Sequence, residues 1–161
     1  MSLSATTDEI MKRLLVVDDH PMIRLGIETI LRPRPEWEVC GTAGSGAEAI
    51  QKASELHPEI IIMDISMPGM SGLEATRVIH SKWPEVKILL LTLYDSVEWV
   101  ETAFRAGARG YLLKSETEGE LLRALEVVSS DALYASPGLD ANRIQRLMMA
   151  LGQGPGSTPQ A

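Results

Sequence analysis

Short apolar runs alternate with amphipathic segments along most of this chain. Five apolar runs have the length and composition of strands, at residues 12–17, 37–41, 60–63, 86–91 and 110–113. A run such as 60–63 has no polar position, which is typical of a strand buried on both faces in a parallel sheet between helices. Five segments with apolar residues at helical spacing follow these runs, at 21–31, 47–56, 73–83, 96–106 and 117–129. The alternation predicts a right-handed, doubly wound parallel α/β sheet.

The two ends of the chain break this pattern. Residues 1–11 are polar and aperiodic, so we expect a disordered N-terminal segment followed by one domain over 12–131. Residues 132–161 read as a linker, with a break at 135–138, a short amphipathic helix over 140–151 and a flexible tail rich in Gly, Pro and Ser. Within the domain, the sequence Thr117-Glu118-Gly119-Glu120 predicts a capping box at the start of the last helix.

Composition excludes several classes of protein. The 161 residues suit one domain with an appendage, and the net charge of −7 disfavours direct binding to nucleic acid or anionic lipid. A single cysteine, Cys40, rules out an internal disulfide and fits a reducing compartment. No apolar run approaches the ~20 residues that span a bilayer. We therefore expect a cytoplasmic protein without a membrane partner.

Polar side chains recur where the predicted strands end. Three acids are among them, Asp18, Asp19 and Asp64, and they are joined by Thr92 and Lys114. In an open α/β sheet the ligand site lies beyond the carboxyl ends of the strands. Carboxylates ~4 Å apart repel by ~4 kcal/mol at an effective dielectric constant of 20, so either some of them stay protonated or a cation joins them, and an all-oxygen site suits Mg²⁺. Lys114 and Thr92 suit a phosphoryl group, so the sequence predicts a phosphoryl-accepting carboxylate.

Two neighbouring features leave alternatives open. Asp64 on its own could simply cap the sharp turn at residues 67–72, which Pro and Gly punctuate. His20 lies beside the acidic pair, but Mg²⁺ prefers oxygen, so we expect a histidine on the loop surface rather than a ligand. The chain has no GxxxxGK[ST] loop, which argues against nucleotide hydrolysis.

These positions, with MDISMPGMSG around Asp64 and GYLL before Lys114, resemble the receiver domain of two-component response regulators. The resemblance runs from about residue 12 to 130 and implies a flavodoxin-like sheet in the order 2-1-3-4-5 with five surrounding helices. It implies that Asp64 is the phospho-acceptor, and that Thr92 and Lys114 contact the phosphoryl group. The expected metal shell, for Mg²⁺, is Asp18, Asp19, Asp64 and the backbone carbonyl of Ser66. The expected switch residues are Thr92 and Tyr111.

The motifs DDHP, GYLLKS and DALYASP resemble the NarL/FixJ subfamily, whose receivers precede a LuxR-type helix-turn-helix domain. This resemblance implies a sensor histidine kinase as partner, a homodimer when phosphorylated, and DNA contact only through a C-terminal domain that the given sequence lacks. Catalysis would be limited to self-catalysed phosphotransfer and dephosphorylation. The alternative is a natural single-domain receiver that acts through protein contacts.

Two rival classes of protein fit these residues less well. Phosphatases of the haloacid-dehalogenase kind also use a strand-end Asp, but they need a second Asp two residues later, where this chain has Ser66. A receiver that docks without being phosphorylated would not need the intact acidic set. In receivers, the positions of Ser66 and Tyr94 flank the path of water to the phosphoryl group. On the neighbouring helix, we expect Trp99 and Glu98 to point away from the apolar side, with Trp99 either an exposed contact residue or partly covered by local packing.

Overall fold

A parallel sheet forms the centre of the computed structural model, which describes residues 11–152. Its strand order is β2-β1-β3-β4-β5-β6 and every neighbouring pair is parallel. The strands are β1 (Lys12–Val17), β2 (Trp37–Ala43), β3 (Ile60–Asp64), β4 (Lys87–Thr92), β5 (Gly110–Leu113) and β6 (Tyr134–Ala135). The helices are α2 (Pro21–Leu31), α3 (Gly46–Leu56), α4 (Gly72–Lys82), α5 (Val97–Ala106), α6 (Thr117–Ser129) and α7 (Ala141–Ala150), with a 3-10 turn, η1 (Lys114–Glu116). The predicted flavodoxin-like order is confirmed, and β6 extends it by one strand that the sequence did not predict.

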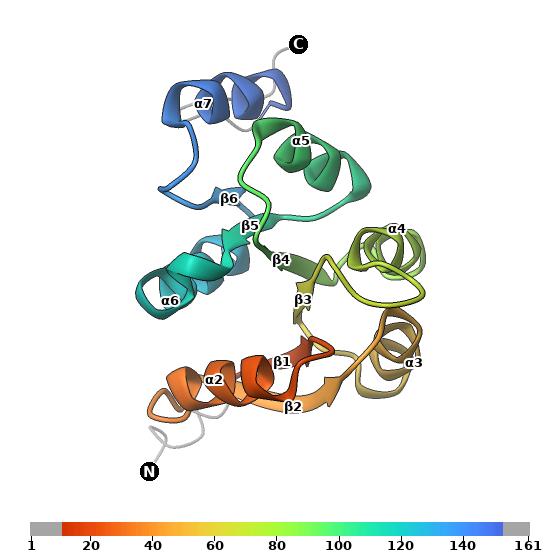
Figure 1. The fold of residues 1–161 in the computed structure, drawn as a ribbon. Helices are drawn as coiled ribbons and strands as arrows, with labels where there is room; N and C mark the ends of the chain where they lie inside the picture. The colour runs from red at the N-terminus through yellow and green to blue at the C-terminus, as the bar shows by residue number, and fades with distance from the viewer. Residues whose placement is uncertain (1–10, 153–161) are drawn as a thin grey trace.

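The helices lie in two layers, one on each face of the sheet. Helices α2 and α6 cover one face, and α3, α4 and α5 cover the other (Figure 1). Alternate residues of each central strand contribute to the two cores, so that Leu14 and Val16 pack on the α2–α6 side while Leu15 and Val17 pack on the other. Strands buried on both faces need apolar side chains at every position, which explains the unbroken apolar runs.

Side-chain caps fix where the helices begin. Ser71 accepts a hydrogen bond from the amide of Glu74, whose carboxylate accepts one from the Ser71 amide, so a capping box forms at the start of α4. The capping box predicted at residues 117–120 is wrong. The η1 turn precedes α6 there, and the Thr117 hydroxyl donates to the Lys114 carbonyl at 3.0 Å instead of accepting from an amide.

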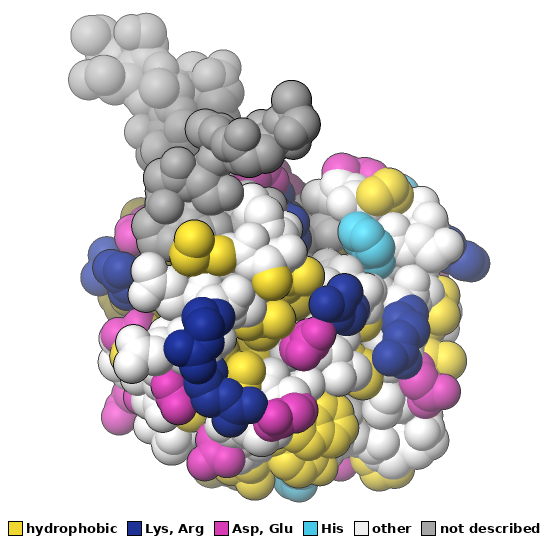
Figure 2. Space-filling model, turned by 90° about the horizontal axis from the view of Figure 1, so that it is seen from above, with side chains coloured by type: hydrophobic (Ala, Val, Ile, Leu, Met, Phe, Trp, Pro, Cys, Tyr) yellow, Lys and Arg dark blue, Asp and Glu magenta, His cyan; other side chains and the backbone are white. Residues whose placement is uncertain are grey.

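Residues 132–152, expected as part of a linker, pack against the domain. Strand β6 pairs with β5, and the buried Ser136 hydroxyl accepts a hydrogen bond from the Leu113 amide at 2.8 Å. The helix expected over 140–151 is α7, whose Ile144 and Leu147 are buried in the core on the α5 side. Seen from above in Figure 2, hydrophobic side chains on this side of the molecule lie between basic and acidic ones rather than forming one continuous patch.

The predicted N-terminal segment and the predicted tail lie mostly outside residues 11–152. The expected disorder of the N-terminal segment and the flexibility of the tail concern residues that lie, apart from Met11 and Gly152, outside the described range. Within residues 11–152, no helix combines the length and apolar character needed to cross a membrane.

Candidate functional site

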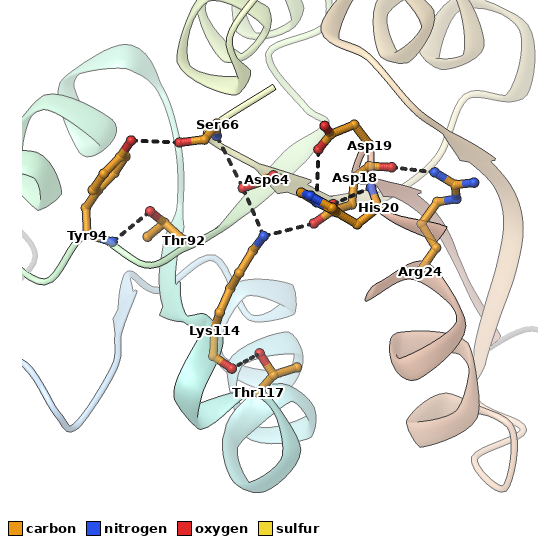
Figure 3. A network of polar contacts seen from close by, with 10 residues as sticks. All are labelled: Asp18, Asp19, His20, Arg24, Asp64, Ser66, Thr92, Tyr94, Lys114 and Thr117. Carbon is orange, nitrogen blue, oxygen red and sulfur yellow. Dashed lines mark hydrogen bonds and ion pairs between the residues drawn. The ribbon is translucent and has the colours of Figure 1, made fainter. Parts of the chain in front are cut away.

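The three predicted acids meet at the carboxyl edge of the sheet. Asp18 and Asp19 follow β1 directly, and Asp64 ends the adjacent strand β3. Figure 3 shows their side chains turned toward one another. Asp18 and Asp64 are buried, whereas a quarter of the Asp19 side chain is exposed. The chain therefore brings three carboxylates together, two of them out of water.

Lys114 reaches this cluster from the end of β5. Its ammonium group lies 3.2 Å from Asp18 Oδ2 and 3.4 Å from Asp64 Oδ1, with its side chain extended across the edge of the sheet (Figure 3). One positive charge is thus shared by two buried carboxylates. The predicted pairing of Lys114 with a phosphate stays a prediction, since in this structure the lysine contacts Asp18 and Asp64.

The charge of Asp64 is only partly compensated. Its Oδ2 atom is buried and accepts no hydrogen bond from any residue between 11 and 152. Burial raises the pKa of Asp64 above the ordinary value, and the neighbouring charge of Asp18 raises it further, against the opposing effect of Lys114. A buried carboxylate oxygen without a partner costs free energy unless a ligand or ion binds it. The arrangement therefore favours the binding of a cation or an electrophile at Asp64.

The turn after Asp64 is held tightly against the end of its strand. The Ser66 amide donates to Asp64 Oδ1 at 3.2 Å, and the Gly72 amide donates to the Ile65 carbonyl at 2.8 Å. A Cβ at position 72 would lie 2.0 Å from the Asp64 carbonyl oxygen, so only glycine allows this approach. These contacts fix the loop in place beside Asp64. The role predicted for the Ser66 carbonyl stays a prediction, as do the roles of the other site residues.

Tyr94 connects the remaining predicted residues. Its amide donates to the Thr92 hydroxyl at 3.0 Å, and its carbonyl accepts from the Tyr111 hydroxyl at 2.6 Å. Its own hydroxyl lies 2.8 Å from the Ser66 hydroxyl, across the mouth of the site (Figure 3). Tyr111 is fully buried, and burial raises the pKa of its phenol. Both predicted switch residues therefore contact the same loop residue.

The aromatic ring of Tyr94 is held from its other side by Trp99. The two rings are stacked, with centroids 4.6 Å apart and planes 12° from parallel. Trp99 is half-buried and packs against the core, which agrees with the partly covered alternative and not with an exposed contact residue. Its neighbour Glu98 does point outward, and its carboxylate lies 2.7 Å from Arg143 of α7. The arginine holds the pKa of Glu98 below its ordinary value.

Two side chains at the site were not predicted to contact it. His20 is largely exposed, as expected of a loop histidine, but its Nδ1 lies 3.1 Å from Asp18 Oδ1 and 3.2 Å from Asp19 Oδ1. Arg24, one turn into α2, donates to the Asp18 carbonyl at 2.5 Å. The position of His20 directly after the acidic pair was the available signal for the first contact. The contact of Arg24 depends on the direction in which α2 follows β1, and the spacing of apolar residues does not predict that direction.

A group of four residues could hold a metal ion. Asp18, Asp19, His20 and Asp64 each offer one ligand atom, and these atoms lie within 4.8 Å of one another. Three are carboxylates, the ligand type that Mg²⁺ prefers. The donor set and the unpartnered Asp64 oxygen together fit a divalent cation.

Comparison with known proteins finds the same domain. Residues 14–126 match the family described as the response regulator receiver domain. The chain is 37% identical to the oxygen regulatory protein NreC of Staphylococcus carnosus over 147 residues, which are 91% of this chain and 68% of that protein. It is 35% identical to the transcriptional regulatory protein DegU of Brevibacillus brevis over 83% of this chain and 56% of that protein. The chain thus spans between about half and two thirds of the length of these relatives.

Solved structures give the same result. A two-component response regulator of the LuxR family from Aurantimonas has a TM-score of 0.79 and 34% identity, over 86% of this chain and 99% of that one. The receiver domain of a response regulator described as NarL from Mycobacterium tuberculosis has a TM-score of 0.71 and 31% identity, over 74% of this chain and 97% of that one.

Proposed function

Because the chain belongs to the response regulator receiver domain family, and within it to the NarL/FixJ subfamily, we propose that Asp64 accepts a phosphoryl group from the phosphohistidine of a sensor kinase. The observation that carries the proposal is the Asp64 Oδ2 atom. It is buried, has no hydrogen-bond partner in the described chain, and lies beside two further acids and Lys114. A carboxylate oxygen in this state is available as a nucleophile.

The transfer needs positioning and charge neutralisation more than covalent catalysis. An Asp64 oxygen forms a bond to phosphorus as the bond from phosphorus to the imidazole nitrogen breaks, and the electron pair of that bond stays on the imidazole. The product is an acyl phosphate on Asp64. Lys114 exchanges part of its contact with Asp64 for a phosphoryl oxygen, and the Thr92 hydroxyl donates to another.

A divalent cation, Mg²⁺, completes this proposal. Asp18, Asp19, Asp64 and the backbone carbonyl of Ser66 would hold it, and the crowding of three carboxylates at one edge supports that assignment. When bound, the ion offsets the negative charge that the phosphoryl oxygens bring to an already anionic site. Without it, Lys114 alone faces the acids and the incoming phosphoryl group.

We propose that the receiver serves a transcription regulator. The relative from Brevibacillus brevis is described as a transcriptional regulatory protein, and the Aurantimonas structure as a LuxR-family regulator. The chain spans 56% of the Brevibacillus brevis protein, so DNA binding would belong to a C-terminal domain outside this sequence. A cytoplasmic location, a homodimer in the phosphorylated state and catalysis limited to self-modification belong to the same proposal. A single-domain receiver acting through protein contacts is the alternative.

The phosphoryl-acceptor assignment can be tested with acetyl phosphate and intact-mass measurement. Wild-type protein should gain one phosphoryl group per chain in the presence of Mg²⁺ and none with EDTA, and Asp64→Asn should gain none. Asp131→Asn is the matched control, because Asp131 lies at the opposite end of the sheet. Its backbone is left-handed, with φ of 68°, a conformation that asparagine also adopts readily. Modification of Asp64→Asn at the wild-type level would overturn the assignment.

A further inference from the structure

A histidine nitrogen lies beside the carboxylates of the proposed Mg²⁺ site. His20 Nδ1 lies 3.1 Å from Asp18 Oδ1 and 3.2 Å from Asp19 Oδ1, and it belongs to the group whose ligand atoms lie within 4.8 Å of one another. The acids alone do not define a new site. Asp64 joins the group from the adjacent strand, and its buried Oδ2 accepts no hydrogen bond from any residue between 11 and 152, so it is free to bind an ion (Figure 3).

Without an ion, the 3.1 Å contact from His20 Nδ1 to Asp18 Oδ1 is a hydrogen bond, and the same distances are close to the spacing of neighbouring ligands around one ion. In an octahedral shell with bonds of about 2.0–2.2 Å, adjacent ligand atoms lie about 2.8–3.1 Å apart. The separations from His20 Nδ1 to both aspartate oxygens exceed this spacing by no more than a few tenths of an ångström. An ion can therefore bind His20 together with the acidic pair with little movement of the ring.

The backbone holds the ring in this position. The His20 amide donates to Asp18 Oδ1 at 2.9 Å, and Pro21 begins α2 at the next residue. Proline restricts the residue before it to extended conformations, and His20 has φ of −102° and ψ of 113°. The imidazole is consequently directed back toward the acids by the same turn that starts the helix.

We propose that His20 Nδ1 is a metal ligand of this receiver, and that it shifts the site from preferring Mg²⁺ toward first-row transition metal ions. This inference rests on the proposed function in one respect: both use the same cation site. Imidazole is a favourable ligand for Co²⁺, Ni²⁺ and Zn²⁺, whereas Mg²⁺ binds oxygen and keeps several waters. With Mg²⁺, a water takes the place of His20. With a transition metal ion, the nitrogen binds directly.

The competing explanation is that His20 acts as a counter-charge to the acids. A positively charged imidazole beside Asp18 and Asp19 would oppose any cation, and its removal would strengthen the binding of Mg²⁺ and transition metals alike. A ligand and a counter-charge therefore predict opposite effects of the same substitution on transition metal binding.

The test is a calorimetric titration with Co²⁺ and, separately, with Mg²⁺. We expect His20→Asn to weaken Co²⁺ binding by at least about tenfold while it changes Mg²⁺ binding by less than about threefold. The matched control is His57→Asn, since His57 ends α3 at the other end of the sheet and has a left-handed backbone conformation, with φ of 50°, that asparagine also adopts. It should leave both affinities unchanged.

Paramagnetic NMR gives an independent readout on the wild-type protein. Bound Co²⁺ should shift the imidazole signals of His20 strongly and those of His57 and His80 weakly. Co²⁺ affinity that is equal or higher in His20→Asn, or His20 signals that do not shift, would overturn the role of His20. Wild-type protein that is modified by acetyl phosphate with Mg²⁺ in the same preparation shows that such a failure concerns His20 alone. Absence of that modification overturns the proposed function instead.

Discussion

Two lysines at opposite ends of the sheet show where this fold leaves charge unbalanced. Lys87 begins β4 at the amino end, where its ammonium group lies 2.9 Å from the Ser129 carbonyl and 3.0 Å from Asp131, a carboxylate that is 76% exposed. Lys114 follows β5 at the carboxyl end and lies between two buried carboxylates. Lys87 is matched by one partner charge that water also solvates. Lys114 faces more negative charge than it can neutralise.

The pKa values of the two partner acids shift in opposite directions. A hydrogen bond from Lys87 lowers the pKa of Asp131. Burial raises the pKa of Asp64, despite the contact with Lys114. The presence of a salt bridge therefore does not mark a functional site in this domain. What distinguishes the carboxyl end is an excess of buried negative charge, which a metal ion can relieve.

The largest difference between the two lysines should appear in phosphorylation. Lys114→Met removes a charge that offsets the phosphoryl oxygens, so we expect the rate of modification by acetyl phosphate to fall about 10²–10³-fold. Lys87→Met should change that rate by less than about twofold. Rates would be followed by intact-mass measurement at fixed Mg²⁺ concentration. Similar losses in both variants would show that the two ends do not differ in the way proposed.

The next effect concerns stabilisation by metal. Mg²⁺ at one hundred times its dissociation constant should raise the free energy of unfolding of the wild type by about 2.7 kcal/mol, if it binds only the folded state. Asp19→Asn loses an anionic ligand and should lose most of this gain at the same Mg²⁺ concentration. Asp131→Asn should retain it. Urea unfolding with Mg²⁺ and with EDTA measures the gain, and full stabilisation of Asp19→Asn would exclude Asp19 from the metal shell.

The pH dependence of stability should have opposite signs at the two ends. Because the pKa of Asp64 is raised on folding, its ionisation opposes folding as pH rises above the ordinary Asp value of about 3.9. In EDTA at pH 7, Asp64→Asn should thus be more stable than the wild type, and the difference should vanish at low pH, where the carboxyl is protonated in both states. The pKa of Asp131 is lowered, so its ionised form stabilises the fold. Asp131→Asn should be less stable than the wild type at pH 7, with the difference lost as pH falls through the folded-state pKa.

Urea unfolding between pH 2 and pH 7 would test both directions with the same two variants. Equal signs for Asp64→Asn and Asp131→Asn would contradict the comparison, because both acids would then be either compensated or uncompensated.

The smallest expected effect is the loss of stability when the Lys87 contact at the amino end of the sheet is removed. Lys87→Met removes a hydrogen bond to the Ser129 carbonyl, which is worth about 1 kcal/mol. The loss should be the same with and without Mg²⁺, because this end of the sheet takes no part in metal binding. A Mg²⁺-dependent change in the unfolding of this variant would mean that the two ends are coupled.

Much of the fold follows from periodicity along the chain. Four apolar residues before Asp64 predicted a strand buried on both faces, and Ile60–Asp64 is such a strand. The acids and Lys114 were predicted to meet because parallel strands end at one edge, and they do meet. Strand β6 was missed because two residues carry no measurable period, and it forms only because β5 offers an open edge.

Side-chain contacts were predicted less well from the sequence than the helices and strands were. The capping box was predicted at Thr117, but the η1 turn occupies that position and leaves the threonine to bind a carbonyl. Helical spacing placed Trp99 away from the apolar side, and could not show that Tyr94 from the preceding loop would stack on it. For His20, the sequence could weigh only the preference of Mg²⁺ for oxygen, because the direction of the ring depends on the turn into α2.

The sequence by itself determined the doubly wound sheet, the edge at which the polar residues gather and the identity of the three acids. These depend on burial and strand direction, which the order of apolar and polar residues records directly. Only the tertiary structure decided that Lys114 is shared by Asp18 and Asp64, that Tyr94 joins Ser66, Thr92 and Tyr111, and that α7 packs on α5. Those contacts depend on distances between side chains from different elements, which packing of the whole domain sets and no local pattern encodes.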